Sequence, residues 1–252
     1  MRQRASNDWR GPMSTIEQIA ARLDGAATSR TPTAQFSADT GLDVPTAYQV
    51  QHAVVAHRTA RGERLVGLKL GLTSRAKMTQ MGVDEVILGR LTDAMHIPDS
   101  GTIRLDDHIH PKVEPEVAFL VEGGAIAAVA PAMEIIDSRY VDFRFTLPEV
   151  VADNTSASGF VLGAWQPVPD GIDNLGVLLE FDGQTIQTGS TAAILGDPRR
   201  ALPEVARLAG SELTDGSVLL AGAATAAVPL RAATHVRVTV DRLGTASLRV
   251  AP

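Results

Sequence analysis

Three glutamates stand in otherwise apolar stretches near the middle of the chain, where a carboxylate is costly unless a positive group compensates it. Glu114 and Glu116 fall in Lys-Val-Glu-Pro-Glu-Val-Ala-Phe-Leu-Val at residues 112–121, and Glu134 falls in a second apolar run at residues 132–136. Side chains alternate along a strand, so Glu114 and Glu116 share one face. Three convergent carboxylates suit a hard divalent cation such as Mg²⁺ or Mn²⁺.

A plainer interpretation of the first two glutamates is also open. Pro115 separates them, and proline is typical of edge strands and bulges. Glu114 and Glu116 could therefore line the solvent face of an edge strand. Their spacing does not decide between this arrangement and a metal site.

Lys69 is the only charged residue in Leu-Val-Gly-Leu-Lys-Leu-Gly-Leu at residues 65–72. The run predicts a buried strand, and a lysine inside such a strand is seldom buried without a partner. The side chain could instead extend to the surface at a strand end. In the functional interpretation, its ammonium group points to a developing enolate or to a substrate carboxylate.

Three blocks of the sequence carry a family resemblance. They are Pro-Lys-Val-Glu-Pro-Glu-Val-Ala-Phe at residues 111–119, Pro-Ala-Met-Glu-Ile-Ile-Asp-Ser-Arg-Tyr at 131–140 and Ala-Asp-Asn-Thr-Ser-Ala-Ser-Gly-Phe-Val-Leu-Gly at 152–163. The chain resembles the 4-oxalocrotonate decarboxylases and 2-hydroxypenta-2,4-dienoate hydratases of aromatic meta-cleavage pathways, within the fumarylacetoacetate hydrolase superfamily. The resemblance runs in order over residues 14–250.

The resemblance implies roles for the residues singled out above. It implies that Glu114, Glu116 and Glu134 bind Mg²⁺ or Mn²⁺. The family has a lysine in a Gly-x-Lys-x-Gly setting in its active site, which favours a catalytic role for Lys69.

Substrate-binding candidates come from two polar stretches. Arg75 follows the Lys69 strand on an expected short helix, where it could be a solvated charge or meet an anionic substrate. Residues 153–159 are small and polar, which is typical of an ordinary loop. The resemblance makes this stretch a wall of the active site, with Asn154 and Ser158 as candidates for binding the substrate carboxylate.

Asp137 and Arg139 follow Glu134 closely in the sequence. They could orient the metal ligands, because ligating carboxylates are usually held by neighbouring groups. They could equally form a structural ion pair, and the sequence leaves both interpretations open.

Ile87 distinguishes the two branches of the family. It lies in Met-Gly-Val-Asp-Glu-Val-Ile-Leu-Gly at residues 81–89, two positions before the last glycine. The hydratase branch has an acidic residue there, which can handle the proton of the incoming water. Isoleucine cannot move a proton, but it can exclude water and surround a departing carboxylate. Asp84 or Glu85 could reach in if the loop folds differently.

The implied reaction is the metal-dependent decarboxylation of 2-oxohex-3-enedioate (4-oxalocrotonate), a small dicarboxylate 2-oxo acid, to 2-hydroxypenta-2,4-dienoate. The first alternative is hydration of 2-hydroxypenta-2,4-dienoate (2-keto-4-pentenoate). A further alternative is acylpyruvate hydrolysis, for which His108 or His110 could act as base. The last is a non-catalytic subunit that assists a pathway partner. The resemblance also implies a homo-oligomer and a possible complex with the pathway hydratase.

Composition excludes several other classes of function. The net charge is −6, and no run of lysine or arginine forms a nucleic-acid-binding stripe. No apolar run approaches the length of a membrane span. With no cysteine in the chain, disulfides and thiolate metal sites are excluded, and a reducing cytoplasm fits.

Helical signals come first in the chain. Residues 1–12 are expected to be a mobile leader, and residues 13–64 a helical portion. A capping box at residues 14–17 predicts a first helix that ends at Gly25. Pro45 starts a second helix, which Gly62 ends.

Strand signals dominate residues 65–252, the expected catalytic portion. Residues 83–95 look like a lid or turn region, and Asp182-Gly183 predicts a hairpin turn. Strands joined by turns, without strand–helix alternation, predict an α+β fold with an antiparallel or mixed sheet. The resemblance sharpens this to a rolled mixed β-sheet of fumarylacetoacetate hydrolase type.

Overall fold

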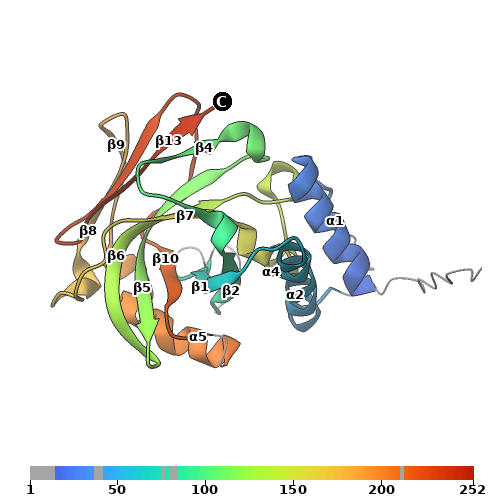
Figure 1. Ribbon diagram of the computed structural model, residues 1–252, viewed down its shortest axis with the longest axis horizontal. Helices are drawn as coiled ribbons and strands as arrows, with labels where there is room; N and C mark the ends of the chain where they lie inside the picture. Colours follow the sequence, from blue (N-terminus) through green and yellow to red (C-terminus); the bar gives the residue numbers. More distant parts are fainter. Residues whose placement is uncertain (1–14, 37–41, 75–77, 80–84, 211–212) are drawn as a thin grey trace, which may run out of the picture.

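The structure, a computed structural model, describes residues 15–36, 42–74, 78–79, 85–210 and 213–252. The expected leader at residues 1–12 and the residue that would open the first capping box lie outside these ranges. Within them, two long helices come first, α1 (Thr15–Ser29) and α2 (Val44–Ala60). They pack side by side at one end of the molecule (Figure 1).

The second helix is as predicted, and the first is longer than predicted. Asp43 caps α2 by accepting a hydrogen bond from the backbone N–H of Thr46 at 2.8 Å, with Pro45 in the first turn. The predicted end of α1 at Gly25 is wrong, because the helix continues to Ser29. Gly25 therefore lies inside the helix, where it costs about 1 kcal/mol relative to alanine, and Ala26 just beyond it is buried.

Two sheets form the rest of the molecule, together with the short helices α4 (Leu147–Ala152) and α5 (Ala201–Ala209). Among the described residues, the larger sheet has eight strands, in the order β2-β1-β10-β5-β6-β7-β3, with β11 also paired to β5. Their bounds are β1 (Leu65–Gly71), β2 (Ile87–Thr92), β3 (His96–Ile97), β5 (Lys112–Glu122), β6 (Ala125–Ile136), β7 (Ala157–Leu162), β10 (Ser217–Ala223) and β11 (Val228–Pro229).

The smaller sheet has five strands in the described part of the chain, in the order β4-β13-β12-β8-β9. They are β4 (Gly101–Arg104), β8 (Gly176–Phe181), β9 (Gln184–Ser190), β12 (His235–Val240) and β13 (Gly244–Ala251). The predicted turn at Asp182-Gly183 joins β8 to β9, and both of its residues have positive φ angles, 51° and 78°. Parallel pairs, such as β1 with β10, stand beside antiparallel ones. The expected α+β fold with a rolled mixed sheet is therefore confirmed (Figure 1).

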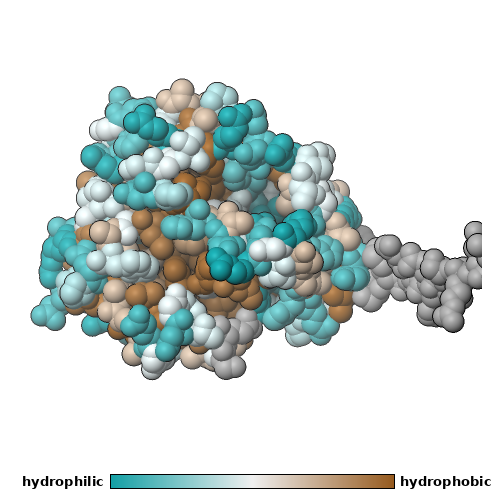
Figure 2. Space-filling model, viewed as in Figure 1, coloured by the Kyte–Doolittle hydropathy of each residue, from teal (hydrophilic) through white to brown (hydrophobic). Residues whose placement is uncertain are grey.

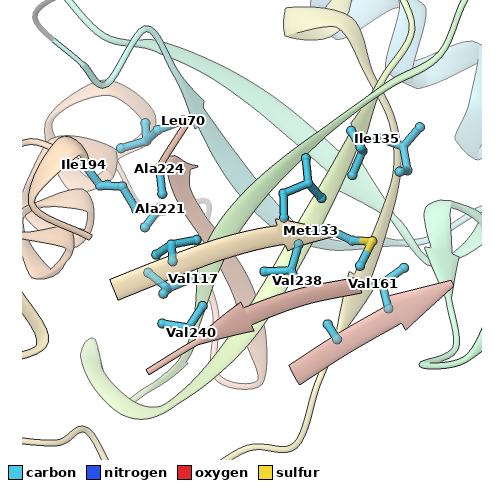
Figure 3. Packing of buried hydrophobic residues seen from close by; sticks show 14 of the residues in the cluster. Leu70, Val117, Met133, Ile135, Val161, Ile194, Ala221, Ala224, Val238 and Val240 are labelled. Atoms are coloured by element: carbon cyan, nitrogen blue, oxygen red, sulfur yellow. The ribbon is translucent and has the colours of Figure 1, made fainter. Parts of the chain in front are cut away.

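The main core lies between the two sheets. Val117, Met133 and Val161 of the larger sheet meet Val238 and Val240 of β12, and all five are fully buried (Figure 3). Burial of a valine or methionine side chain contributes about 1.5–3 kcal/mol. This core fixes the curvature of β5 and β6, which carry the three glutamates.

A second core joins the N-terminal helices to the larger sheet. Gln51 of α2 is fully buried and donates hydrogen bonds to Leu88 O and Val151 O, both at 2.8 Å. The prediction of a lid or turn at residues 83–95 is wrong for β2, whose six residues are all buried. Gly89 and the charged Arg90 obscure this strand in the sequence, because both are unusual in a buried strand.

No helix in the described ranges is long and apolar enough to cross a membrane.

Candidate metal and substrate site

The three glutamates meet on adjacent strands. Glu114 of β5 lies directly opposite Glu134 of β6, and Glu116 is two residues further along β5 on the same face. One carboxylate oxygen from each lies within 4.8 Å of those of the other two. The side chains are buried, and β5 runs inside the sheet between β10 and β6. The edge-strand interpretation is therefore wrong.

A bulge in β10 explains how Pro115 and Glu116 fit inside a sheet. The pairing register of β10 with β5 shifts between Leu220 and Ala223. The bulge presents the backbone N–H of Gly222 to Glu116 Oε2 at 2.9 Å. Glu116 Oε1 is also buried, and no group among the described residues donates a hydrogen bond to it.

Gly222 is required at the bulge. Its φ angle is 118°, and a Cβ there would lie 2.1 Å from Thr73 Oγ1. Only glycine adopts this conformation readily and allows the close approach. The N–H group that holds Glu116 thus depends on the absence of a side chain.

Lys69 of β1 points into the same cluster. Its side chain is 3% exposed, and Nζ lies 3.0 Å from Glu134 Oε1. Nζ also donates a hydrogen bond to Thr155 O at 3.0 Å. The alternative in which Lys69 extends to the surface is wrong. Gly89 lies opposite Lys69 in β2, where a Cβ would be 2.8 Å from Lys69 Cδ, so glycine makes room for the lysine.

The charges of this cluster fit a divalent cation. With all four groups ionised, three carboxylates and one ammonium carry a net charge of −2, which one divalent cation neutralises. Burial raises the pKa of Glu116 well above its ordinary value, and the Glu134 and Glu114 carboxylates raise it further, against the opposing effect of Lys69. Oxygen donors of this kind and the buried Glu116 Oε1 fit Mg²⁺ or Mn²⁺.

A cavity of about 730 Å³ opens beside the cluster. Lys69 and Glu114 lie on its wall, and Ile87 also lines it. The remaining lining residues are mainly apolar, hydroxyl-bearing or cationic: Leu70, Gly71, Leu72, Thr73, Ser74, Lys112, Ile136, Phe143, Arg144, Phe145, Val150, Thr155, Ser156, Ala193, Ala223, Ala224, Thr225, Ala226 and Ala227.

The structure places Thr155 and Ser156 on the cavity wall, and not the predicted Asn154 and Ser158. The Asn154 side chain is instead bound to the backbone of Arg90. Its Oδ1 accepts a hydrogen bond from Arg90 N at 2.8 Å, and its Nδ2 donates one to Arg90 O at 2.9 Å. The Ser156 hydroxyl is buried and has no hydrogen-bond partner among the described residues. Because Ser156 lines the cavity, this hydroxyl is a candidate donor to a ligand there.

An unusual backbone turns these side chains. Asn154, Thr155 and Ser156 have φ angles of 48°, 54° and 57°, a left-handed conformation that costs non-glycine residues free energy. Thr155 Oγ1 donates a hydrogen bond to Leu88 O at 2.8 Å, which helps to hold the turn. The small polar residues at 153–159 were the only sequence signal for it.

Two other predicted residues brace loops. Arg139 forms a buried ion pair with Asp153, so the structural interpretation holds for it, with Asp153 as the partner in place of Asp137. Asp137 accepts hydrogen bonds from the backbone N–H groups of Ile109 and His110, at 2.9 and 2.8 Å.

The remaining candidates do not line the cavity or cannot be placed. His108 and His110 bond backbone carbonyl groups and are not cavity-lining. Glu85 is exposed and lies 4.0 Å from Arg207, away from the cavity wall. Arg75 and Asp84 lie outside the described residues.

Sequence reasoning missed two further cationic residues of the cavity, Lys112 and Arg144. Lys112 lies on the same face of β5 as Glu114, and its Nζ is 3.8 Å from the ring centroid of Phe143. Arg144 follows Phe143 and lines the same cavity. The two-residue spacing of Lys112 from Glu114 was a usable signal for the first, whereas Arg144 had none.

Comparison with known proteins identifies close relatives. The sequence is 51% identical over 247 residues to a 4-oxalocrotonate decarboxylase from Pseudomonas sp., which covers 92% of this chain and 96% of that protein. It is 36% identical over 227 residues to a 2-keto-4-pentenoate hydratase from Paraburkholderia xenovorans (strain LB400), covering 82% and 84%. No family model matches the sequence.

A solved structure shares the fold over nearly the whole chain. It is a 4-oxalocrotonate decarboxylase from Pseudomonas putida G7, complexed with magnesium and adipate. The TM-score is 0.89 at 32% sequence identity, and the match covers 95% of this chain and 99% of that one.

Proposed function

The chain belongs to the family of the 4-oxalocrotonate decarboxylases and 2-keto-4-pentenoate hydratases, and from this premise we propose that it decarboxylates 2-oxohex-3-enedioate to 2-hydroxypenta-2,4-dienoate with Mg²⁺ or Mn²⁺. One observation carries the proposal. Three buried carboxylates cluster beside a buried lysine, and Glu114 and Lys69 of this cluster line a cavity whose wall is largely apolar.

The glutamates are the proposed metal ligands. Glu114, Glu116 and Glu134 would hold one divalent cation through their oxygens, and Gly222 fixes one oxygen of Glu116 for that purpose. When bound, such a cation supplies Lewis acidity where negative charge develops on the ketone oxygen.

Electrons move in one direction through the substrate. The bond between the distal carboxylate carbon and its CH₂ group breaks, CO₂ leaves, and the electron pair enters the conjugated system. Charge accumulates on the oxygen of the 2-oxo group, which then takes up one proton to give the 2-hydroxy product. The protein must stabilise that oxygen and accommodate a neutral leaving group.

Lys69 is suited to the first task. An ammonium group carries three N–H donors, and one of them is donated to Thr155 O. A remaining N–H can reach a substrate oxygen in the cavity, where a fixed positive charge stabilises developing negative charge more than it would in water. Ser156, with its free buried hydroxyl, is the proposed donor to the carboxylate of the 2-oxo acid end.

Ile87 is suited to the second task. It is 4% exposed and lines the cavity together with Leu72, Ile136 and Val150. This apolar surface excludes water from the cavity, and it offers no group that could accept or donate the proton of an incoming water molecule. This supports decarboxylation over hydration.

The test supplies purified enzyme and Mg²⁺ with each substrate separately. We expect CO₂ release from 2-oxohex-3-enedioate without hydration of 2-hydroxypenta-2,4-dienoate. Efficient hydration without CO₂ release would mean that the chain is a hydratase, the second candidate that its hydratase relatives support. Ile87→Val and Ile87→Thr form a matched pair of nearly equal shape, and the threonine variant should release CO₂ more slowly than the valine variant.

We further propose that the chain acts in the cytoplasm as a homo-oligomer and can associate with the pathway hydratase. Apolar residues gather in the middle of one face, above β5, β6 and β10, which supports an interface (Figure 2). Light scattering tests the homo-oligomer, and a monomer at working concentration would contradict that part of the proposal.

A further inference from the structure

We propose that Lys112 and Arg144 form an anion subsite at the mouth of the cavity, which binds the second carboxylate of the substrate and selects dicarboxylates over monocarboxylates. The inference rests on the proposed function, because it takes the 2-oxo acid end of the substrate to lie at the three glutamates.

The face of β5 that carries the glutamates leads from the floor of the site to its mouth. Every second residue of β5 lies on this face, and among these are Glu116, Glu114 and Lys112. Their exposure increases in that order: Glu116 is 1% exposed, Glu114 is 6% exposed and Lys112 is half-buried. Each step of two residues advances about 7 Å along the strand. Arg144, from the segment between β6 and α4, lines the same cavity and is exposed.

This spacing matches the substrate. Five carbon–carbon bonds of about 1.5 Å each separate its two carboxylate carbons. A chain of that length, held at Glu114, extends along β5 to the level of Lys112. Ile136 lies opposite Lys112 in β6, and Phe143 and Phe145 also line the cavity, so the carbon chain of the ligand would cross apolar surface.

Lys112 is held in place by an aromatic ring, and Arg144 reaches the cavity wall as an exposed residue. Lys112 Nζ rests on the ring of Phe143, whose other contacts include the ring of His110 at a centroid distance of 5.0 Å. Within the described ranges, neither the Lys112 nor the Arg144 side chain forms an ion pair, although the Glu114 carboxylate acts electrostatically on Lys112. Two cationic side chains beside an apolar channel favour an anionic end group on the ligand.

The subsite should affect binding more than turnover. The carboxylate it holds loses its charge as CO₂ leaves, so the attraction weakens on the way to the transition state. An interaction that is stronger in the ground state lowers KM without raising kcat. Lys112 and Arg144 are thus positioning and specificity-determining residues, in contrast to Lys69.

The test uses two six-carbon 2-oxo acids that differ only in the distal carboxylate. Binding of 2-oxoadipate and 2-oxohexanoate to the full-length, Mg²⁺-loaded protein is measured by calorimetry. Lys112→Gln and Arg144→Gln should each weaken 2-oxoadipate binding by about five-fold and leave 2-oxohexanoate binding unchanged. Lys112→Arg and Arg144→Lys keep the charge and should preserve the preference.

Arg231→Gln is the matched control, because Arg231 is exposed and does not line the cavity. In kinetics with 2-oxohex-3-enedioate, the Gln variants should raise KM and not lower kcat. Equal weakening of both acids, or a lower kcat at unchanged KM, would overturn the subsite.

The subsite and the proposed function can fail separately. If the wild-type protein releases no CO₂ but still prefers 2-oxoadipate through Lys112 and Arg144, the proposed reaction fails and the subsite stands. If CO₂ is released but the two acids bind equally well, the reaction stands and the subsite is overturned.

Discussion

Lys69 Nζ lies 3.0 Å from Glu134 Oε1, although two strands separate their parent strands in the sheet. β10 and β5 lie between β1 and β6, and three inter-strand steps of about 4.8 Å amount to about 14 Å in a flat sheet. The curvature of the sheet and the length of the two side chains close this gap. The curled sheet thereby brings a cation and three carboxylates to one point.

Removing the Lys69 charge should impair turnover more than folding. Lys69→Met keeps most of the unbranched side chain but not the cation, so it should lower kcat by about 10²–10³-fold if Lys69 stabilises the developing oxyanion. With Mg²⁺ bound, the free energy of unfolding should fall by less than the activation barrier rises. Steady-state kinetics and urea unfolding in Mg²⁺ measure both, and a wild-type kcat would assign Lys69 a structural role only.

Metal affinity should depend on Glu116 and not on Glu122, the exposed carboxylate at the end of the same strand. Glu116→Gln removes one charge from the cluster, and we expect Mn²⁺ affinity to fall by more than about 100-fold. Mutating a residue that only hydrogen-bonds a metal ligand lowers affinity by at most about 100-fold, so a larger loss indicates a ligand. Glu122→Gln, at the exposed end of β5, is the matched control. Calorimetric Mn²⁺ titration measures both, and comparable affinities would show that Glu116 is not a ligand.

The stability of the metal-free protein should decrease as the pH rises. The pKa of folded Glu116 is well above its ordinary value of 4.5, so between these two pKa values the folded state holds more protons than the unfolded state. Its contribution is fully present below about pH 4.5 and is lost as the pH rises through the folded pKa, with a slope of at most about 1.4 kcal/mol per pH unit.

Urea unfolding across this pH range, with chelator or with Mg²⁺, measures the effect. Saturating Mg²⁺ should remove the decline, because a bound cation favours the ionised carboxylate. Glu116→Gln should flatten the metal-free profile. An unchanged slope in that variant would attribute the titration to another group.

The features that the sequence predicted are those that depend on the pattern of apolar and polar residues within one segment. Alternation along a strand placed Glu114 and Glu116 on one face, and the isolated charge of Lys69 in an apolar run pointed to a buried partner. The α+β class also followed from the local signals.

What the sequence did not predict depends on contacts between distant segments. The left-handed turn that puts Ser156, and not Asn154, on the cavity wall is held by bonds to β2. β2 itself is buried because α2 covers it, through Gln51. Arg144 lines the same cavity as Lys112 because residues 143–145 form part of the cavity wall. No periodicity reports such contacts.

Gly222 offers a test of the bulge that positions Glu116. In Gly222→Ala, the new Cβ would lie 2.1 Å from Thr73 Oγ1 at a φ angle of 118°, so the backbone must shift and its N–H must move away from Glu116 Oε2. We expect a loss of about 2 kcal/mol or more in the free energy of unfolding, together with weaker Mn²⁺ binding.

Gly176→Ala is the control for this substitution, since Gly176 is exposed, has no positive φ and has no atom within 4 Å of an added Cβ. It should change stability by less than about 0.5 kcal/mol and leave Mn²⁺ binding intact. Because a general loss of stability alone would not weaken the binding of Mn²⁺ to the folded protein, the titration separates the two effects. Wild-type Mn²⁺ affinity in a folded Gly222→Ala variant would show that the bulge N–H does not position Glu116.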